Sequence, residues 1–144
     1  MLYNRAQKYS GGKTGYVKEE LAREINLAIE AGYTKFISGM ADGVDLYFAE
    51  IVAEAQNVYP DITLKAALTH RKRLESKNPT FQRLIKQCDS VHVTAEIYGR
   101  GAYLNKNMYM IGKSGLVIAV YAESTNLTLH YAQRRGREIH IIPV

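Results

Sequence analysis

The chain alternates short apolar runs with longer segments in which apolar residues recur every three or four positions. The short runs predict strands at residues 34–38, 62–68, 90–94, 116–121 and 138–143. The periodic segments predict helices at residues 16–31, 46–55, 81–88, 104–114 and 129–135. Because helices and strands alternate throughout, we expect an α/β fold with parallel strands and right-handed crossovers.

Two of the expected strands constrain the architecture. Residues 116–121 are apolar without interruption, which predicts burial on both faces and a central position in the sheet. A doubly wound sheet also needs a first strand before residue 16, and only Met1, Leu2 and Tyr3 are available for it. We therefore expect a first strand that is short, or a native start that lies further upstream.

Length and charge narrow the class of protein. A chain of 144 residues suits one domain, residues 1–144, with a sizeable core. Lysine and arginine number 19 against 14 acidic residues, which gives a net charge of +5 and a pI of about 9.3. This excess favours anionic ligands. It is spread along the chain, however, and no block of like charge indicates nucleic acid by itself.

Cysteine content and hydropathy exclude several other classes. Cys88 is the only cysteine, which excludes an intramolecular disulfide and a cysteine-rich metal site, and we expect it to pack as a small apolar residue. The N-terminus lacks the apolar core of a signal peptide, and no apolar run is long enough to span a bilayer. We expect a soluble, cytoplasmic protein without a metal, a resident cofactor or a membrane partner, in which a sheet edge or a helix face could form a homo-oligomer.

The segment 36–45 joins a predicted strand to a predicted helix through a loop that contains Gly39 and Gly43. At such a junction, main-chain N–H groups and the positive end of the helix dipole favour an anion. We expect Gly39 to adopt a positive φ and Gly43 to let a phosphate or a neighbouring strand approach closely. The alternative is a tight turn in which Asp42 or Asp45 caps the helix, and loop composition does not separate the two interpretations.

The glycine spacing matches neither of the common nucleotide-binding motifs. Gly-x-x-x-Gly differs from the dinucleotide motif GxGxxG, and no Gly-Lys-Ser/Thr follows it as in a Walker A loop. Residues 10–14 look superficially like a phosphate loop, but the gap between their glycines is too short and no strand precedes them. The sequence therefore does not support a standard NAD-binding or ATPase assignment.

Basic residues follow the predicted strand at 62–68. Because the carboxyl ends of parallel strands share one edge of a sheet, we expect this cluster to lie near the glycine loop. Arg71 is the candidate for a phosphate or carboxylate contact, since a guanidinium can grip such a group with two hydrogen bonds. We expect Lys72 and Arg73 to lie in a solvated surface loop. We expect His70 to be an ordinary surface histidine, with a ligand contact as the alternative.

Two further segments are candidates for contact with a ligand. Residues 96–103 contain glycine and tyrosine and predict a loop that folds over a ligand at this edge. Ser124, Thr125 and Asn126 stand at a second strand-to-helix turn, where their side chains can hydrogen-bond a ligand or cap the helix. Capping alone explains them adequately.

Residues 38–45, Ser-Gly-Met-Ala-Asp-Gly-Val-Asp, resemble the Ser-Gly-x-Ala-x-Gly-x-Asp loop of the SLOG superfamily, which includes DprA and the LOG phosphoribohydrolases. The similarity is closest to the YpsA-like branch and extends through residues 59–61, 106–110, 116–121 and 131–137. It implies a three-layer, doubly wound Rossmann-like domain with a mainly parallel sheet. It also implies recognition of nucleotides or nucleotide-derived small molecules, although most members have no known biochemical activity.

The chain departs from the family pattern at several places. Where the family has Thr-Gly-His-Arg-Pro, residues 2–6 retain only Arg5. Residues 124–126 stand in place of a Gly-Gly-Thr turn, and Gly112 and Gly115 replace two aspartates. The Pro-Gly-Gly-x-Gly-Thr-x-x-Glu motif of the LOG enzymes is absent, so the resemblance does not transfer their hydrolase chemistry to this chain.

The loop and the resemblance together favour a non-catalytic module that binds or senses a nucleotide or a nucleotide-derived small molecule. The candidate ligand-binding residues are Ser38, Gly39, Met40, Ala41, Gly43, Val44, Asp45, Arg5, Arg71, Asn107, Ser124, Thr125 and Asn126. Asp45 is the candidate acceptor for a ribose hydroxyl. Tyr98, Tyr103 and Tyr121 are candidates for stacking on a base, with a core or interface role as the alternative for Tyr121.

Two other functions stay open at this point. One is a glycosidic-bond hydrolase that uses Asp45 or Glu123, which would need two carboxylates in one pocket. The other is a DprA-like binder of single-stranded DNA, which would need a basic groove with aromatic side chains beside it. Residues 71–73 and 134–137 could supply the charge for such a groove.

Overall fold

Helices and strands alternate along the chain as the sequence predicts. The computed structural model describes residues 2–4, 14–95, 99, 101–121 and 127–144. Its elements are β1 (Leu2–Asn4), α1 (Thr14–Glu30), β2 (Lys35–Ser38), α2 (Val44–Ala55), β3 (Thr63–Leu68), η2 (Arg71–Glu75), α3 (Pro79–Gln87), β4 (Ser90–Val93), α4 (Ala102–Gly112), β5 (Leu116–Tyr121), α5 (Leu127–Arg134) and β6 (Glu138–Pro143). The 3-10 helix η2 contains Lys72 and Arg73, for which the sequence predicts a surface loop. None of the helices in this part of the chain combines the length and the apolar character that a bilayer crossing requires.

The described strands pair in parallel and form two three-stranded sheets, in the orders β1-β5-β6 and β2-β3-β4. β5 lies between β1 and β6, which confirms the central position predicted from its apolar sequence. β1 is three residues long, and it aligns Leu2 with Ile118 of β5. No pairing joins the two sheets among the described residues.

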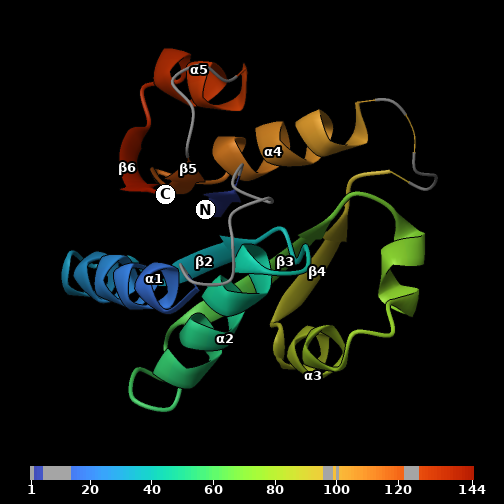
Figure 1. Cartoon of the computed structure of the whole chain (residues 1–144), viewed down its shortest axis with the longest axis horizontal. Coiled ribbons are helices and arrows are strands. Elements are labelled where there is room, and N and C mark those ends of the chain that lie inside the picture. The colour runs from blue at the N-terminus through green and yellow to red at the C-terminus, as the bar shows by residue number, and fades with distance from the viewer. Residues whose placement is uncertain (1, 5–13, 96–98, 100, 122–126) are drawn as a thin grey trace.

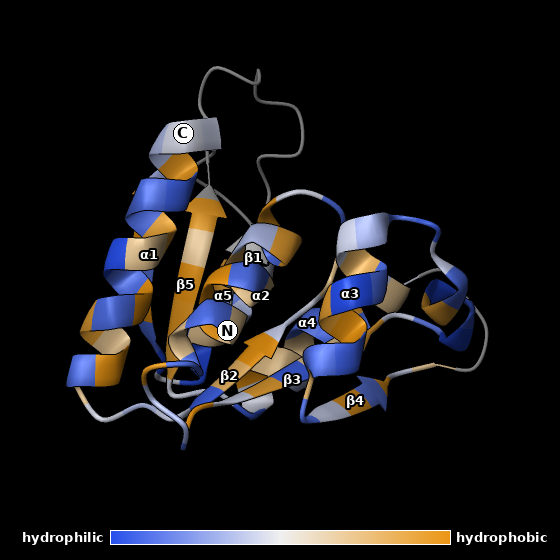
Figure 2. Ribbon diagram, turned by 90° about the horizontal axis from the view of Figure 1, so that it is seen from below, coloured by the Kyte–Doolittle hydropathy of each residue, from blue (hydrophilic) through white to orange (hydrophobic). Residues whose placement is uncertain are grey.

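Helices cover both faces of the strands. Figure 1 shows α1, α2 and α3 below the strands and α4 and α5 above them, which confirms the three-layer, doubly wound architecture. In β5, Leu116, Ile118 and Val120 belong to the core that contains α1, α2 and α3. The alternate residues Val117 and Ala119 belong to the core formed with α4 and α5. Both faces of β5 are therefore buried, and the strand is hydrophobic along most of its length in Figure 2.

The connections between the elements direct several segments to one edge of the fold. β2 and β3 run in parallel with Ser38 aligned to Ala66, so the loop after β2 and the helix η2 after β3 leave from the same edge. The chain reaches α4 after β4 and then crosses the other face to return to β5 beside β1. This reversal of strand order is where doubly wound folds commonly bind ligands.

Cys88 packs as the sequence predicts. It follows α3, lies partly buried against the core, and donates from its thiol to the main-chain oxygen of Leu84 over 3.4 Å. Burial raises the pKa of the thiol to about 11, so the neutral form prevails at ordinary pH. Cys88 therefore behaves as a small apolar side chain.

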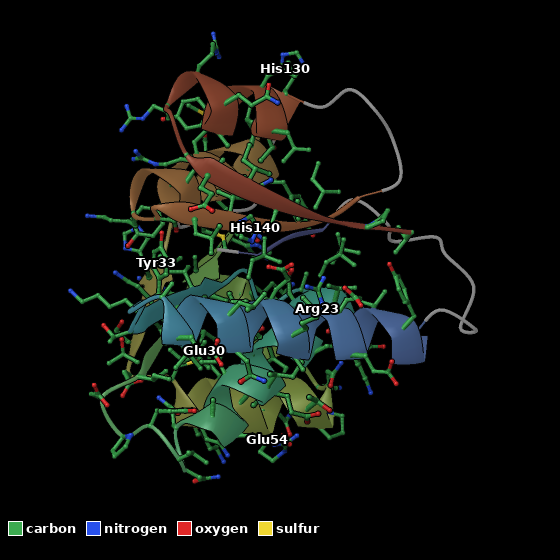
Figure 3. All side chains as sticks on the ribbon, turned by 90° about the vertical axis from the view of Figure 1, so that its left-hand side faces the viewer. Arg23, Glu30, Tyr33, Glu54, His130 and His140 are labelled. Carbon is green, nitrogen blue, oxygen red and sulfur yellow. The ribbon has the colours of Figure 1, made fainter. Side chains whose placement is uncertain are left out.

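His140 links β6 to α1 through two carboxylates. Its Nδ1 lies 2.8 Å from Glu24 Oε2, and its Nε2 lies 2.8 Å from Glu138 Oε1. Figure 3 shows His140 at the junction between the sheet and α1. Its hydrogen bond to Glu24 and then that to Glu138 raise the pKa of His140 above 6.5. The protonated imidazole therefore stabilises the packing of α1 against β6.

The raised pKa predicts a pH-dependent contribution of His140 to stability. The contribution is complete below the unfolded-state pKa of about 6.5 and is lost as the pH rises through the higher folded-state pKa. We expect His140→Gln to lower the free energy of unfolding at about pH 5.5 and to have little effect at about pH 9, as measured by urea denaturation. His130→Gln, on the exposed side of α5 in Figure 3, is the control and should give equal differences from the wild type at both pH values. Equal destabilisation by His140→Gln at both pH values would contradict the proposed charge effect.

Candidate functional site

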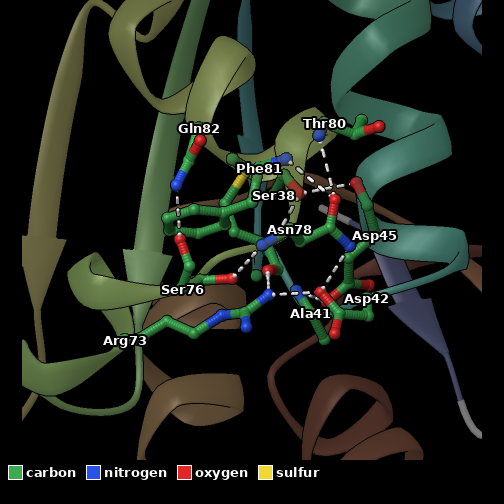
Figure 4. Close-up of polar contacts among 12 residues, drawn as sticks. Ser38, Ala41, Asp42, Asp45, Arg73, Ser76, Asn78, Thr80, Phe81 and Gln82 are labelled. Carbon is green, nitrogen blue, oxygen red and sulfur yellow. Dashed lines mark hydrogen bonds and ion pairs between the residues drawn. The ribbon is translucent and has the colours of Figure 1, made fainter.

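The loop between β2 and α2 is closed by its own side chains. Ser38 Oγ donates to the main-chain oxygen of Asp45 over 2.9 Å and accepts the N–H of Met40 over 3.1 Å. Asp45 Oδ2 accepts the N–H of Ala41 over 3.1 Å (Figure 4). Two of the main-chain N–H groups that we expected to bind an anion are therefore engaged within the loop.

The two glycines of this loop have roles opposite to those predicted. Positive φ angles occur at Met40, with 57°, and at Gly43, with 92°, but not at Gly39. Gly43 is the N-cap residue of α2 and makes no side-chain cap bond, so neither Asp42 nor Asp45 caps this helix. A Cβ at Gly43 would meet no heavy atom within 4 Å. Backbone conformation, rather than space, therefore requires glycine at position 43.

Gly39 instead makes room for two buried charged side chains. A Cβ at this position would lie 2.6 Å from Lys106 Nζ and 2.8 Å from Asp45 Oδ2. Lys106 is only 4% exposed and Asp45 only 6%. Lys106 Nζ donates to the main-chain oxygen of Gly39 over 3.4 Å. The missing side chain thus lets a lysine from α4 and an aspartate from α2 approach each other beyond the end of β2.

Burial perturbs the pKa of both of these groups. Desolvation raises the pKa of Asp45, while the positive charge of Lys106 and the hydrogen bond from Ala41 act in the opposite direction. Desolvation lowers the pKa of Lys106, while the negative charge of Asp45 opposes that shift. Each charge therefore offsets part of the desolvation cost of the other. Perturbed acid and base groups beside a cavity are a frequent mark of functional sites.

Arg73 connects η2 to the glycine loop, so the prediction that it lies on a solvated surface is wrong. Its Nη2 donates to the main-chain oxygen of Met40 and, over 2.9 Å, to Asp42 Oδ1. Its guanidinium carbon lies 4.5 Å from the centre of the Phe81 ring. Asn78, the N-cap residue of α3, also donates to Asp42 Oδ1, over 3.1 Å (Figure 4). The tertiary structure thus places a carbonyl, a carboxylate and an aromatic ring in contact with the guanidinium of Arg73. These contacts keep it partly buried.

A cavity of about 820 Å³ lies beside this network. Its lining residues are Thr14, Gly39, Ala41, Asp42, Gly43, Val44, Tyr47, Thr69, His70, Lys72, Arg73, Glu75, Ser76, Tyr103 and Lys106. The basic cluster after β3 therefore lies near the glycine loop, as predicted, and His70 faces the cavity as a half-buried residue. Over the described ranges, no group of three or more His, Cys, Asp or Glu side chains is arranged to hold a metal ion.

The predicted site residues of the glycine loop have different roles in the structure. Gly39, Ala41, Gly43 and Val44 line the cavity. Ser38 and Asp45 are buried as hydrogen-bonding partners of the loop. The side chain of Met40 belongs to the apolar core, so this residue can offer a ligand only its main chain.

Two more predicted residues, Asn107 and Arg71, lie in the described part of the chain but do not line the cavity. Asn107 Nδ2 donates to Thr128 Oγ1 over 3.3 Å and so links α4 to α5. Arg71 is exposed at the start of η2 and is not among the lining residues. The other predicted contacts lie outside the described residues: Arg5, Ser124, Thr125 and Asn126, together with Tyr98 and Glu123.

Lys106 is not among the site residues predicted from the sequence, although the sequence contains a relevant pattern. The buried positions of α4 include Ala102, Lys106 and Met110, which recur every four residues along one face. Lysine is rarely buried unless it is paired, so a lysine in this series indicates a charge with a partner. The pattern could have marked Lys106 as a candidate. It could not have identified Asp45 as the partner.

The parallel strands, the loop after the second strand and the cavity at the edge of the sheet define a Rossmann-like domain. The chain belongs to the YspA SLOG family, whose model matches residues 7–140. It is 30% identical over 132 residues to a UPF0398 protein of Bacillus cereus (strain G9842), covering 85% of this chain and 72% of that protein. It is 29% identical over 130 residues to a UPF0398 protein of Bacillus thuringiensis (strain Al Hakam), covering 83% of this chain and 71% of that protein. These matches confirm the resemblance to the YpsA-like branch.

The contacts around Gly39 predict that a side chain at this position forces Lys106 or Asp45 to move. We expect Gly39→Ala to lower the free energy of unfolding by about 1–3 kcal/mol, because the new Cβ displaces Lys106 or Asp45. Gly112→Ala is the matched control, since a Cβ there meets nothing within 4 Å and the residue lies in α4 without a positive φ. Alanine at position 112 should be neutral or stabilise by up to about 1 kcal/mol. Urea denaturation of both variants checks this, and equal stabilities would refute the close approach at Gly39.

Proposed function

We propose that this protein binds a nucleotide or a nucleotide-derived small molecule in the cavity beside the glycine loop and does not convert it chemically. The observation that carries the proposal is the cavity itself. Its volume of about 820 Å³ falls within the range of small-molecule sites. It also lies at the edge where doubly wound folds bind ligands. Membership in the YspA SLOG family supports a nucleotide-related function at the level of the superfamily.

The chemistry of the lining residues suits the parts of a nucleotide. Lys72, Arg73 and Lys106 provide positive charge for phosphate. Tyr103 lines the cavity and is 48% exposed, so its ring is accessible for stacking on a base. Thr69 and Ser76 provide hydroxyl groups for hydrogen bonds to a sugar.

The described carboxylates favour binding over hydrolysis. Glycosidic-bond hydrolysis generally uses two carboxylates that flank the scissile bond. Asp45 is buried and accepts a hydrogen bond from Ala41, and Asp42 is held by Arg73 and Asn78. Both are engaged in holding the loop. Glu75, which is exposed, also lines the cavity, so one of the described carboxylates there is not engaged in the loop, whereas the hydrolysis would need two. The hydrolase alternative keeps one specific observation in its favour, which is the perturbed pair of Asp45 and Lys106 at the cavity.

The two basic clusters give little support to single-stranded DNA as the ligand. The cluster at 71–73 follows the carboxyl end of β3, whereas the cluster at 134–137 precedes the amino end of β6. Lys72 and Arg73 line the cavity, and none of residues 134–137 does. A continuous groove for a nucleic-acid backbone would need its charges along one path.

A thermal-shift panel of AMP, ADP-ribose, NAD and cyclic nucleotides tests the proposal. A ligand present at about a hundred times its Kd should stabilise the fold by about 2.7 kcal/mol and raise the Tm by roughly 5–10 °C. Chromatography of the incubated ligand should show it unchanged, whereas a released base would favour the hydrolase. No response to any member of the panel, together with salt-dependent oligonucleotide binding, would favour the DNA alternative instead.

Tyr103 provides a test of how the base would be recognised. We expect Tyr103→Ala to weaken binding of the responding nucleotide roughly tenfold, since stacking of a base on an aromatic ring contributes about 1–3 kcal/mol. Tyr59→Ala is the matched control, because Tyr59 is also exposed, at 43%, and does not line the cavity. Calorimetric titration measures both affinities. Equal affinities of the two variants would remove Tyr103 from the proposed site.

A further inference from the structure

Lys106 presents a buried ammonium group to the cavity. An ammonium group has three N–H donors. The described contacts of Lys106 Nζ are one hydrogen bond of 3.4 Å to the main-chain oxygen of Gly39 and a position 5.1 Å from the centre of the Tyr103 ring. Asp45 supplies an opposite charge, but its Oδ2 accepts the N–H of Ala41. The ammonium group can therefore donate to a ligand without breaking a contact that closes the loop.

Several other donors near the cavity already bind groups of the loop. The N–H groups of Met40 and Ala41 bind Ser38 and Asp45, respectively. The guanidinium of Arg73 donates to the main-chain oxygen of Met40 and to the carboxylate of Asp42. An anion that bound these N–H groups or this guanidinium would have to break their present hydrogen bonds. An anion that bound Lys106 would leave all of these hydrogen bonds intact.

The start of α2 adds positive potential at the same place. Gly43 and Val44 form the beginning of this 12-residue helix, and both line the cavity together with Lys106. The positive end of a helix dipole favours an anion there. A buried ammonium group from α4 and a helix terminus from α2 therefore converge on one cavity, although they come from opposite layers of the fold.

We propose that Lys106 Nζ binds a phosphoryl group of the ligand, and that Gly39 and Asp45 are positioning residues that hold the ammonium group at the cavity. This inference rests on the proposed function and deepens it, because it assigns the ligand to phosphorylated compounds rather than nucleosides. A phosphoryl group carries about −1.5 to −2 charges at pH 7, and a compact ammonium group binds it as a point charge. Partial exclusion of water strengthens that attraction.

The role assigned to Asp45 differs from that of a ligand contact. Its negative charge opposes an incoming phosphate, while its Oδ2 holds the loop through Ala41. Asn in its place keeps a side-chain oxygen for that hydrogen bond and removes the charge. The two members of the pair therefore have opposite expected effects on phosphate binding, which a purely structural pair would not have.

The test measures binding of inorganic phosphate by ³¹P NMR titration at constant ionic strength. We expect Lys106→Met to weaken phosphate binding at least tenfold, because the ammonium group is lost. Lys113→Met is the matched control, since Lys113 follows the same helix, is exposed and does not line the cavity; its affinity should stay within about twofold of the wild type. Asp45→Asn should bind phosphate as tightly as the wild type or more tightly.

Each other outcome overturns the inference. Wild-type affinity in Lys106→Met would remove Lys106 as the contact, and an equal loss in Lys106→Met and Asp45→Asn would make the pair structural. Absence of phosphate binding by the wild type would also contradict it. If Lys106→Met does not unfold cooperatively, the double variant Lys106→Met/Asp45→Asn, which leaves no unpaired buried charge, takes its place and should likewise lose phosphate.

The same proteins separate this inference from the proposed function. Adenosine and AMP are titrated against the wild type and Lys106→Met. If the wild type prefers AMP over adenosine at least tenfold and Lys106→Met loses that preference, both proposals stand. If the wild type binds AMP and Lys106→Met binds it equally, the nucleotide site stands and the role of Lys106 fails. If the whole panel and adenosine fail to bind while phosphate binds through Lys106, the proposed function fails and the anion site stands.

Discussion

The arrangement of the site depends on the close approach of Lys106 and Asp45 across Gly39. α2 and α4 cover opposite faces of the strands, and their side chains can meet only beyond the end of β2, where no strand separates them. A single Cβ at position 39 would occupy the space that both charged groups use. The absence of a side chain at this position therefore allows charged residues from two layers of the fold to interact electrostatically.

Burial of Lys106 and Asp45 is energetically possible because neighbouring groups also bind both charged side chains. Two charges taken out of water lose several kcal/mol of hydration each, and their attraction repays this only when hydrogen bonds complete the geometry. Asp45 obtains such a bond from Ala41, and Lys106 gives one to Gly39. Removal of one charge would leave the other buried without its counter-charge. Because both side chains also bind the loop, we expect the stability of the pair and that of the loop to depend on each other.

Arg73 extends these contacts to a third segment of the chain. It joins η2 to the loop through Met40 and Asp42 and packs over Phe81 of α3. The loop is thus held by hydrogen bonds of Ser38 and Asp45 within the segment 38–45, and by the guanidinium of Arg73 from η2. A cavity wall fixed in this way loses little conformational entropy when a ligand binds, which favours affinity. The same contacts explain why its main-chain N–H groups are less available to an anion than the sequence suggested.

Sequence alone determined the order of the elements, because hydrophobic periodicity reflects which residues each helix and strand must bury. The apolar run of β5 predicted its central position, and the glycines after β2 marked the loop beside which the cavity lies. Tertiary structure decided which side chains meet there. Arg73, Lys106 and Asp45 are separated by long stretches of chain, and sequence carries no direct record of such distances. The two glycines are also required for different reasons, which only the structure shows. A side chain at position 39 would collide with Lys106 of α4, whereas position 43 has a positive φ that favours glycine.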